Sequence, residues 1–246
     1  MRGKTFRIAT WNIASNKNFD AIASRISDLD IDICAMQEVS FAPTTDLPAM
    51  FGHMDGSASE YDWHFMPALT PERLGGGKFE YYGLGLFSRI RLRRTAAFQL
   101  GPKDIGPPFN AESEPRILQI ATANLGKPFL IANTHLAATD DWSMSAVRRL
   151  QAMNVADILR SSAEKEVLIL CGDFNTAPAS SDLAKLKEVL PHVYSSKMST
   201  YVMEPVRPPI DFFFCSAPLE LDISVHPSGG MSDHDIVVAT LQGNDD

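Results

Sequence analysis

The chain has 246 residues, 45% hydrophobic and 21% charged, a composition typical of a globular protein that buries a full core without disulfides. Its formal net charge of −8 disfavours a general nucleic-acid binder, which would more often be basic, although a local patch or a bound metal could still attract phosphate. The sequence has no stretch of roughly 20 apolar residues, which argues against a membrane-spanning helix, and it begins without the apolar core of a signal peptide.

Hydrophobic periodicity predicts a chain rich in strands. Residues 6–12 alternate and are β-prone, which predicts a first strand, and apolar residues on one helical face predict a helix over 19–29. Further strands are predicted at 31–37, 61–66, 81–88, 92–100, 116–124, 129–134, 167–171, 210–215 and 236–241. Helices are predicted at 143–160 and 181–190, and loops at 40–60, 74–78 and 101–115.

The order of these elements predicts one continuous domain over residues 1–246, with a frayed tail at 243–246. Strands 81–88 and 92–100 are expected to pair with each other, and the next two strands to form a hairpin. Because strands dominate and helices lie between some of them, we expect packed sheets with helices outside.

The three cysteines lie in apolar runs, and we expect all of them to be buried. They are Cys34, Cys171 and Cys215, and no two have the spacing of metal ligands. This usage fits a reducing compartment. Together with the N-terminal sequence, it leads us to expect a cytoplasmic protein, and we expect a monomer.

Polar side chains stand where the apolar strands end or begin. Asn12, Glu38, His135 and Asp173 each follow an apolar run, Asn175 lies two residues beyond Asp173, and Asp211 and the pair Asp233 and His234 precede apolar runs. In α/β proteins ligand sites gather at strand ends, because the rigid sheet aims the side chains of the flanking loops. Buried polar groups are costly unless they are paired or bind a metal. The sequence therefore predicts one polar pocket centred on a metal.

The residue types in this pocket favour phosphoryl chemistry with a hard cation. Mg²⁺ prefers one or two carboxylates such as Glu38 with water and substrate oxygens, whereas zinc prefers His and Cys, which do not cluster in this sequence. The chain also lacks the Gly-x-Ser-x-Gly elbow of serine hydrolases and the phosphate loop of nucleotide hydrolases. Each residue alone has a structural alternative: a turn for Asn12 and Asp173, a capping or surface carboxylate for Glu38, and a core imidazole for His135.

Six short motifs occur in a fixed order along the chain. They are Thr10-Trp11-Asn12-Ile13, Gln37-Glu38, Asn133-Thr134-His135-Leu136, Gly172-Asp173-Phe174-Asn175, Ile210-Asp211-Phe212-Phe213-Phe214 and Ser232-Asp233-His234. The ensemble resembles the endonuclease/exonuclease/phosphatase superfamily with its deoxyribonuclease-I-like fold. The resemblance implies an α/β fold, a four-layer α/β sandwich of two packed mixed β-sheets with helices outside. It also implies a phosphoester hydrolase that uses Mg²⁺, with Mn²⁺ as an alternative.

The resemblance further implies roles at the metal and the attacking water. Glu38 would ligate the metal directly, with Asn12 and Asp233 beside it. Asp173 would orient or deprotonate the attacking water, and Asn175 would hold a phosphate oxygen.

The remaining implied roles concern the two histidines and their partners. His135 would contact the phosphate or the leaving group, and His234, held by Asp211, would contact the phosphate. Glu80 resembles a glutamate that pairs with the first histidine in some members, and Arg116 resembles an arginine near the site. For Glu80 and Arg116 a surface salt bridge is an equal alternative.

Two observations bear on the substrate, which the sequence leaves open. Asp235 follows the last motif where many members have an apolar residue and then proline, and it adds negative charge near the site. With the net charge, this favours a small or lipid-like phosphodiester, or a phosphomonoester, over nucleic acid.

The alternative is an endonuclease or exonuclease acting on DNA or RNA. Alternation places Arg91 and Arg93 on one strand face, which is either solvated or a phosphate track. Arg148 and Arg149 are expected on a solvated helix face. A non-catalytic binding module with the same fold is the remote alternative, because such a module should have lost motif residues that are all present here.

Overall fold

The computed structural model describes residues 5–42, 61–70, 80–101, 109–124, 127–139, 141, 143–204 and 206–242. The strands are β1 (Thr5–Asn12), β2 (Ile33–Phe41), β3 (Asp62–Leu69), β4 (Tyr81–Ser88), β5 (Arg93–Gln99), β6 (Ile117–Asn124), β7 (Pro128–His135), β8 (Leu168–Asp173), β9 (His192–Tyr194), β10 (Asp211–Cys215), β11 (Leu221–His226) and β12 (Ile236–Gln242). The helices are α1 (Phe19–Asp28), α4 (Ala146–Ala163), the 3₁₀ helix η2 (Ser181–Leu183) and α5 (Ala184–Val189).

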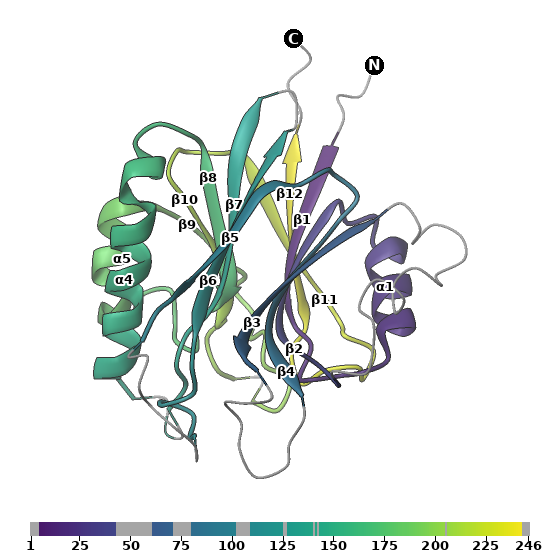
Figure 1. Cartoon of the computed structure of the whole chain (residues 1–246), viewed down its shortest axis with the longest axis horizontal. Coiled ribbons are helices and arrows are strands. Elements are labelled where there is room, and N and C mark those ends of the chain that lie inside the picture. Colours follow the sequence, from purple (N-terminus) through teal and green to yellow (C-terminus); the bar gives the residue numbers. More distant parts are fainter. Residues whose placement is uncertain are drawn as a thin grey trace.

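The strands form two six-stranded mixed sheets. The first has the order β11-β12-β1-β2-β4-β3 and the second the order β5-β6-β7-β8-β10-β9. Figure 1 shows the sheets face to face, with α1 outside the first sheet and α4 and α5 outside the second. The expected four-layer α/β sandwich is therefore confirmed.

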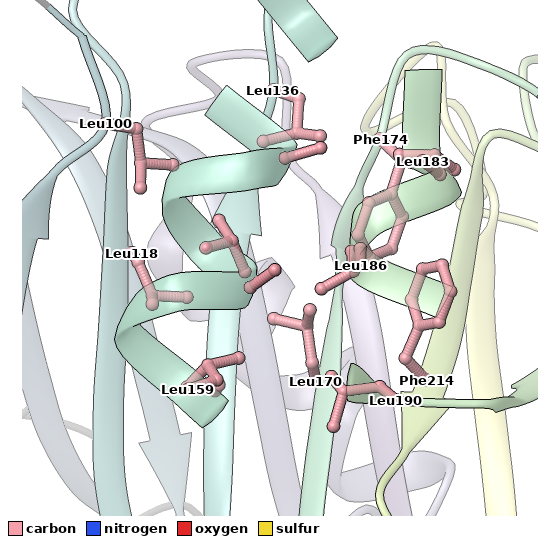
Figure 2. Packing of buried hydrophobic residues seen from close by; sticks show 14 of the residues in the cluster. Leu100, Leu118, Leu136, Leu159, Leu170, Phe174, Leu183, Leu186, Leu190 and Phe214 are labelled. Atoms are coloured by element: carbon pink, nitrogen blue, oxygen red, sulfur yellow. The ribbon is translucent and has the colours of Figure 1, made fainter. Parts of the chain in front are cut away.

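The three largest hydrophobic clusters among the described residues hold these layers together. α1 buries Phe19 and Ile22 on the outer face of the first sheet, a second cluster lies between the sheets, and a third joins α4 and α5 to the second sheet (Figure 2). Along β10, Phe212 and Phe214 belong to the helix-side cluster, whereas Phe213 belongs to the cluster between the sheets. Alternate side chains leave a strand on opposite faces, so a strand covered on both faces is apolar throughout.

Several predicted elements differ from the structure. β4 and β5 do not pair with each other; β4 lies between β2 and β3 in the first sheet, and β5 is the edge of the second sheet next to β6. The expected hairpin of β6 and β7 is present as an antiparallel pair. β9 and β11 were not predicted, because β9 has three residues and β11 is a partly exposed edge strand. The predicted helix over 181–190 is divided into η2 and α5.

The predicted loops at 40–60 and 74–78 and the tail at 243–246 lie wholly or largely outside the described residues, as does the part of the loop at 101–115 that spans residues 102–108. The three cysteines are buried and free, as expected. Across the described ranges, no helix combines the length and the apolar character that crossing a bilayer requires.

Candidate active site

The motif residues converge at one end of the sandwich. β1 pairs parallel with β2, and β7 with β8, so that His135 and Asp173 end their strands side by side. β10 runs antiparallel to β8 and begins at this edge, where Asp211 lies opposite Asp173. Asn12 at the end of β1 reaches across from the other sheet, since its Nδ2 donates to Asp173 Oδ2 at 3.0 Å. The strand ends of both sheets thus bring these polar side chains together.

A bulge in β2 aims the side chain of Glu38. The pairing of β2 with β4 shifts register between Met36 and Val39, and Glu38 has a φ of 54°. A non-glycine residue in this left-handed region is uncommon, and bulges often re-aim a side chain at a functional site. Asn12 Nδ2 donates to Glu38 Oε1 at 3.0 Å, and the Glu38 side chain is only partly buried. The carboxylate is therefore oriented by Asn12 and reachable from solvent.

Asp173 lies at the centre of the pocket and is 1% exposed. Gly172 before it has a φ of 152° and runs so close to β7 that a Cβ would lie 1.9 Å from Thr134 O, so only glycine fits there. The backbone N–H of Asn175 donates to Asp173 Oδ1 at 2.9 Å. Burial, followed by the charge of Asp211, raises the pKa of Asp173 to about 7. A carboxyl group with this pKa is suited to accept a proton from water at neutral pH.

Asn175 is held in a fixed orientation beside Asp173. Its φ of 50° also lies in the left-handed region, its Nδ2 donates to Leu136 O at 2.9 Å, and its backbone oxygen accepts from Arg148 Nη1 at 3.0 Å. A side-chain amide carries two N–H donors, and the second has no partner among the described residues. One donor is therefore left for a ligand.

Asp211 and His234 form a buried ion pair. His234 Nδ1 lies 2.9 Å from Asp211 Oδ2, and the hydroxyl of Thr200 donates to the same oxygen at 2.5 Å. His234 Nε2 lies 3.8 Å from Asp173 Oδ2. Burial lowers the pKa of His234, but the carboxylates of Asp211 and Asp173 outweigh this effect and raise the pKa to about 10. His234 is therefore a charged imidazolium at neutral pH.

His135 has the opposite environment. Its Nδ1 lies 2.8 Å from Arg116 Nη1, and its Nε2 lies 3.5 Å from Asp173 Oδ2. Burial, the charge of Arg116 and the charge of His234 lower the pKa of His135 well below its usual value. The two imidazoles of one pocket thus differ in charge.

Glu80 takes part in the ion pair that was its alternative role. It accepts a hydrogen bond from Ser40 Oγ at 2.9 Å and forms an ion pair with Lys17. The two ring nitrogens of His135 face Arg116 and Asp173 instead. The partner at His135 Nδ1 is therefore the cationic side chain of Arg116.

Asp233 lies on a loop that is tied to β1. Ser232 Oγ donates to Asn12 O at 2.6 Å and lies 3.4 Å from Asp233 Oδ1. Among the described residues, the cluster of three candidate ligand side chains consists of Asp173, Asp211 and His234 and does not include Asp233. The part of Asp233 in cation binding is therefore a proposal.

Arg148 departs most from its predicted position. It was expected on a solvated helix face, yet it is 0% exposed. Its Nε and Nη2 lie 3.1 and 2.9 Å from Asp182 Oδ2, and its Nη1 donates to Ala137 O and Asn175 O at 3.2 and 3.0 Å. Ala137 follows β7 and Asn175 follows β8. The buried guanidinium therefore ties together the two loops that leave the pocket.

Two buried amides connect the sheets beneath the pocket. Gln37 Nε2 donates to Asn133 Oδ1 at 2.8 Å, and Asn133 Nδ2 donates to Met36 O and Gly85 O at 3.0 and 3.2 Å. Gln37 lies in the first sheet and Asn133 in the second. A buried polar network with its groups paired fixes one arrangement, so these two motif residues set the position of the sheets rather than the chemistry.

The polar groups of the pocket fit a hard cation. The four carboxylates of Glu38, Asp173, Asp211 and Asp233 supply oxygen donors only, and Asp211 Oδ1 is buried without a partner among the described residues. One ligand atom each from Asp173, Asp211 and His234 also lies within 4.8 Å of the others. That group already contains an internal ion pair, whereas the Glu38 carboxylate is more open to solvent. Mg²⁺ and Mn²⁺ prefer such oxygen donors.

Comparison with known proteins agrees with this geometry. The family model described as "Endonuclease/Exonuclease/phosphatase family" matches residues 9–234, which contain the pocket residues named above. The chain belongs to this family. A search of curated proteins finds no match to the chain.

Solved structures of other family members share the fold. The mannosyl-6-phosphatase of Bacteroides thetaiotaomicron is 18% identical with a TM-score of 0.66, over 95% of this chain and 98% of that one. The human Nocturnin catalytic domain with bound sulfate is 22% identical with a TM-score of 0.67, over 96% and 93%. TDP2 of D. rerio, complexed with a single-strand DNA product, is 16% identical with a TM-score of 0.67, over 96% and 98%. At these identities the likeness establishes the fold and not the substrate.

Proposed function

We propose that this family member is a divalent-metal-dependent phosphoester hydrolase in which water, activated by Asp173, attacks phosphorus in line with the leaving group. One observation carries the proposal: Asp173 is buried at the meeting point of both sheets, and its pKa is raised to about 7. A general base works best when its pKa lies near the working pH. A raised pKa of a buried carboxyl group beside a charged partner is typical of catalytic residues.

Mg²⁺, with Mn²⁺ as a substitute, would be held by Glu38, which Asn12 orients through its Nδ2, with Asp233 beside it. When bound, the cation would neutralise negative charge on the phosphoryl oxygens. Glu38 and Asp233 are only partly buried, so their carboxylate oxygens are open to a cation, which supports this site.

The other residues position the phosphoryl group. The imidazolium of His234, held by Asp211, would bind a phosphoryl oxygen by charge, and the second N–H of the Asn175 amide would donate to another. His135 would donate a hydrogen bond from Nε2 on the same side. These donors are fixed before substrate binds, so the site loses little free energy in reorganising during the reaction.

A small or lipid-like phosphodiester, or a phosphomonoester, is the favoured substrate. Arg91, Arg93 and Arg94 line a hollow together with Asn124, Pro128 and Glu166. Pro128 begins β7 and His135 ends it, which separates this hollow from the pocket by roughly 20 Å. The arginines therefore do not line the pocket, and among the described residues this leaves little basic surface for a long nucleic acid at the reacting phosphate. Asp235, next to His234 in the sequence, adds negative charge near the pocket. Its Oδ1 accepts a hydrogen bond from Ser228 N at 3.0 Å.

A substrate panel tests the proposal. Purified protein with Mg²⁺ or Mn²⁺ would be given bis-p-nitrophenyl phosphate, p-nitrophenyl phosphate, sphingomyelin, RNA and plasmid DNA. Turnover of a phosphoester that excess chelator removes is expected. Turnover unchanged in chelator, or none with any phosphoester, would refute a metal-dependent hydrolase.

The nuclease alternative has its own outcome in the same panel. It draws support from the family member solved with a DNA product. Plasmid nicking that collapses between about 50 and 200 mM salt, and that is lost in Arg91→Ala/Arg93→Ala, would make this protein a nuclease with a phosphate-contacting surface. A small phosphodiester cleaved at a rate that salt hardly changes is the result that we expect.

A further inference from the structure

Arg116 meets His135 in a way that fixes the proton on the imidazole. Arg116 is 5% exposed, its Nη1 lies 2.8 Å from His135 Nδ1, and its Nη2 lies 2.8 Å from Glu114 Oε2. A guanidinium has five N–H donors and no acceptor, and it stays charged in proteins. Nδ1 must therefore accept this hydrogen bond. An imidazole whose Nδ1 accepts is neutral and carries its single proton on Nε2.

We propose that Arg116 is a positioning residue that holds His135 as a neutral imidazole protonated on Nε2, so that His135 donates a hydrogen bond to the phosphoryl group but releases no proton to it. The second half of this proposal rests on the proposed function. The first half, the tautomer, does not.

The surroundings of Arg116 keep it in place. Glu114 supplies the carboxylate that pairs with Nη2, and the hydroxyl of Tyr82 lies 3.5 Å from the same Glu114 oxygen. Arg116 also lies directly before β6, and the next residue but one on that strand pairs with Thr134, the neighbour of His135. The sheet pairing and the ion pair together hold the guanidinium against Nδ1.

The other charged groups at His135 agree with a neutral ring. Besides Arg116, the groups that face it are the Asp173 carboxylate near Nε2 and the imidazolium of His234. A proton on Nδ1 would point at a buried cation, whereas a proton on Nε2 points at Asp173 Oδ2, 3.5 Å away. Burial and the two neighbouring cations lower the pKa of His135 well below its usual value, which also favours the neutral ring.

The two histidines of the pocket therefore differ in charge and can take different roles. His234 faces two carboxylates and is cationic, whereas His135 faces a guanidinium and is neutral. Titratable groups whose environments push their pKa values apart commonly take different roles in one site. If a proton is donated to the leaving group from an imidazole, it comes from His234.

Nuclear magnetic resonance of the wild-type protein, with 15N in its histidine rings, tests the tautomer directly. An unprotonated ring nitrogen resonates far from a protonated one, while an imidazolium gives two similar shifts. We expect His135, assigned with His135→Gln, to show an unprotonated Nδ1 and a protonated Nε2 throughout about pH 5–8, the range in which free histidine titrates. An imidazolium pattern, or a proton on Nδ1, would overturn the proposal.

Variants of Arg116 separate the charge effect from a structural one. Arg116→Lys keeps a cationic donor and should keep the wild-type pattern, whereas Arg116→Glu offers an acceptor and should move a proton to Nδ1. Arg91→Glu, a matched change at an exposed arginine, should leave the pattern unchanged. If Arg116→Glu does not fold, the wild-type and Arg116→Lys spectra still decide. A wild-type pattern in folded Arg116→Glu would overturn the role of Arg116.

Activity tests the second half of the proposal. The amide of Gln can replace a neutral Nε2–H donor, so His135→Gln should lose much less kcat than His135→Ala, for which a loss of about 100-fold is typical of one donor. His234→Gln should lose as much as His234→Ala, because the amide carries no charge. Equal losses in His135→Gln and His135→Ala would refute the donor role. Absence of any metal-dependent turnover in wild-type protein would instead refute the proposed function and leave the tautomer result standing.

Discussion

Arg148→Met should destabilise the protein far more than a surface substitution does. Arg148 is fully buried, and its removal leaves the buried Asp182 with only Arg149, whose side chain is half exposed, as a cationic partner. Breaking one partner of a buried ion pair costs about 3–5 kcal/mol. The carbonyl oxygens of Ala137 and Asn175 also lose their donor, at about 1 kcal/mol each. The expected total is a loss of about 5–7 kcal/mol, a large part of the 5–15 kcal/mol that is typical of folded domains.

The neighbouring arginine provides the control. Arg149 contacts the same Asp182 carboxylate at 3.4 Å, but its side chain is 50% exposed. Exposed pairs of this kind are worth about 0–1 kcal/mol, so Arg149→Met should be nearly neutral. Arg148→Met/Asp182→Leu should recover part of the loss, because the unpaired charge is gone, although Ser145 N then loses its acceptor.

Urea unfolding at pH 7, extrapolated linearly to zero denaturant, measures the free energies of unfolding. Heating gives a second measure, with an expected fall in Tm of about 10 °C or more in Arg148→Met. Equal and small effects of Arg148→Met and Arg149→Met would refute the reasoning and return Arg148 to the solvated face that its charge suggested.

Two further predictions concern the pocket. Glu38→Gln should remain folded and lose metal-stimulated turnover, because it removes the direct cation ligand; full activity in this variant would move the cation elsewhere. The pKa of His234 is raised to about 10 in the folded protein, so the charged imidazolium stabilises the fold. This stabilisation should be complete below about pH 6.5 and should disappear as the pH rises through about 10. The free energy of unfolding, measured in chelator across this pH range, tests it. Asp211→Asn should remove most of that dependence, and kcat losses in Asp211→Asn/His234→Ala should be far less than additive; additive losses would show that the pair does not act as a unit.

The sequence indicated the residues at the strand ends better than the buried residues that hold those strand ends and loops in place. Strand-end residues such as Asp173 and His135 could be found because apolar runs stop abruptly at polar side chains, and parallel pairing then brings such ends together. Arg148 was placed on the wrong face because its charge suggested solvent. Yet Arg148 lies four residues before Ala152 and seven before Val155, on the buried face of α4. This helical spacing indicates a buried position for Arg148.

Other contacts left no signal in the sequence. Thr200 lies in a loop remote from every motif, and only the fold places its hydroxyl on Asp211. The separation of β4 from β5 depends on the chain crossing between sheets after Ser88, which local periodicity does not encode. The partner of His135 was likewise undetermined, because Glu80 and Arg116 both had plausible places near it and only the side-chain geometry chooses between them.

The kcat of Asp173→Asn, measured with saturating Mg²⁺ on the best phosphoester of the panel, tests the central claim most directly. The substitution keeps the size of the side chain and its hydrogen bond from the Asn175 backbone, but it removes the group that accepts a proton from water. We predict that kcat falls by several orders of magnitude while KM changes little. A rise in KM with kcat preserved would assign Asp173 to binding and contradict its role as the base.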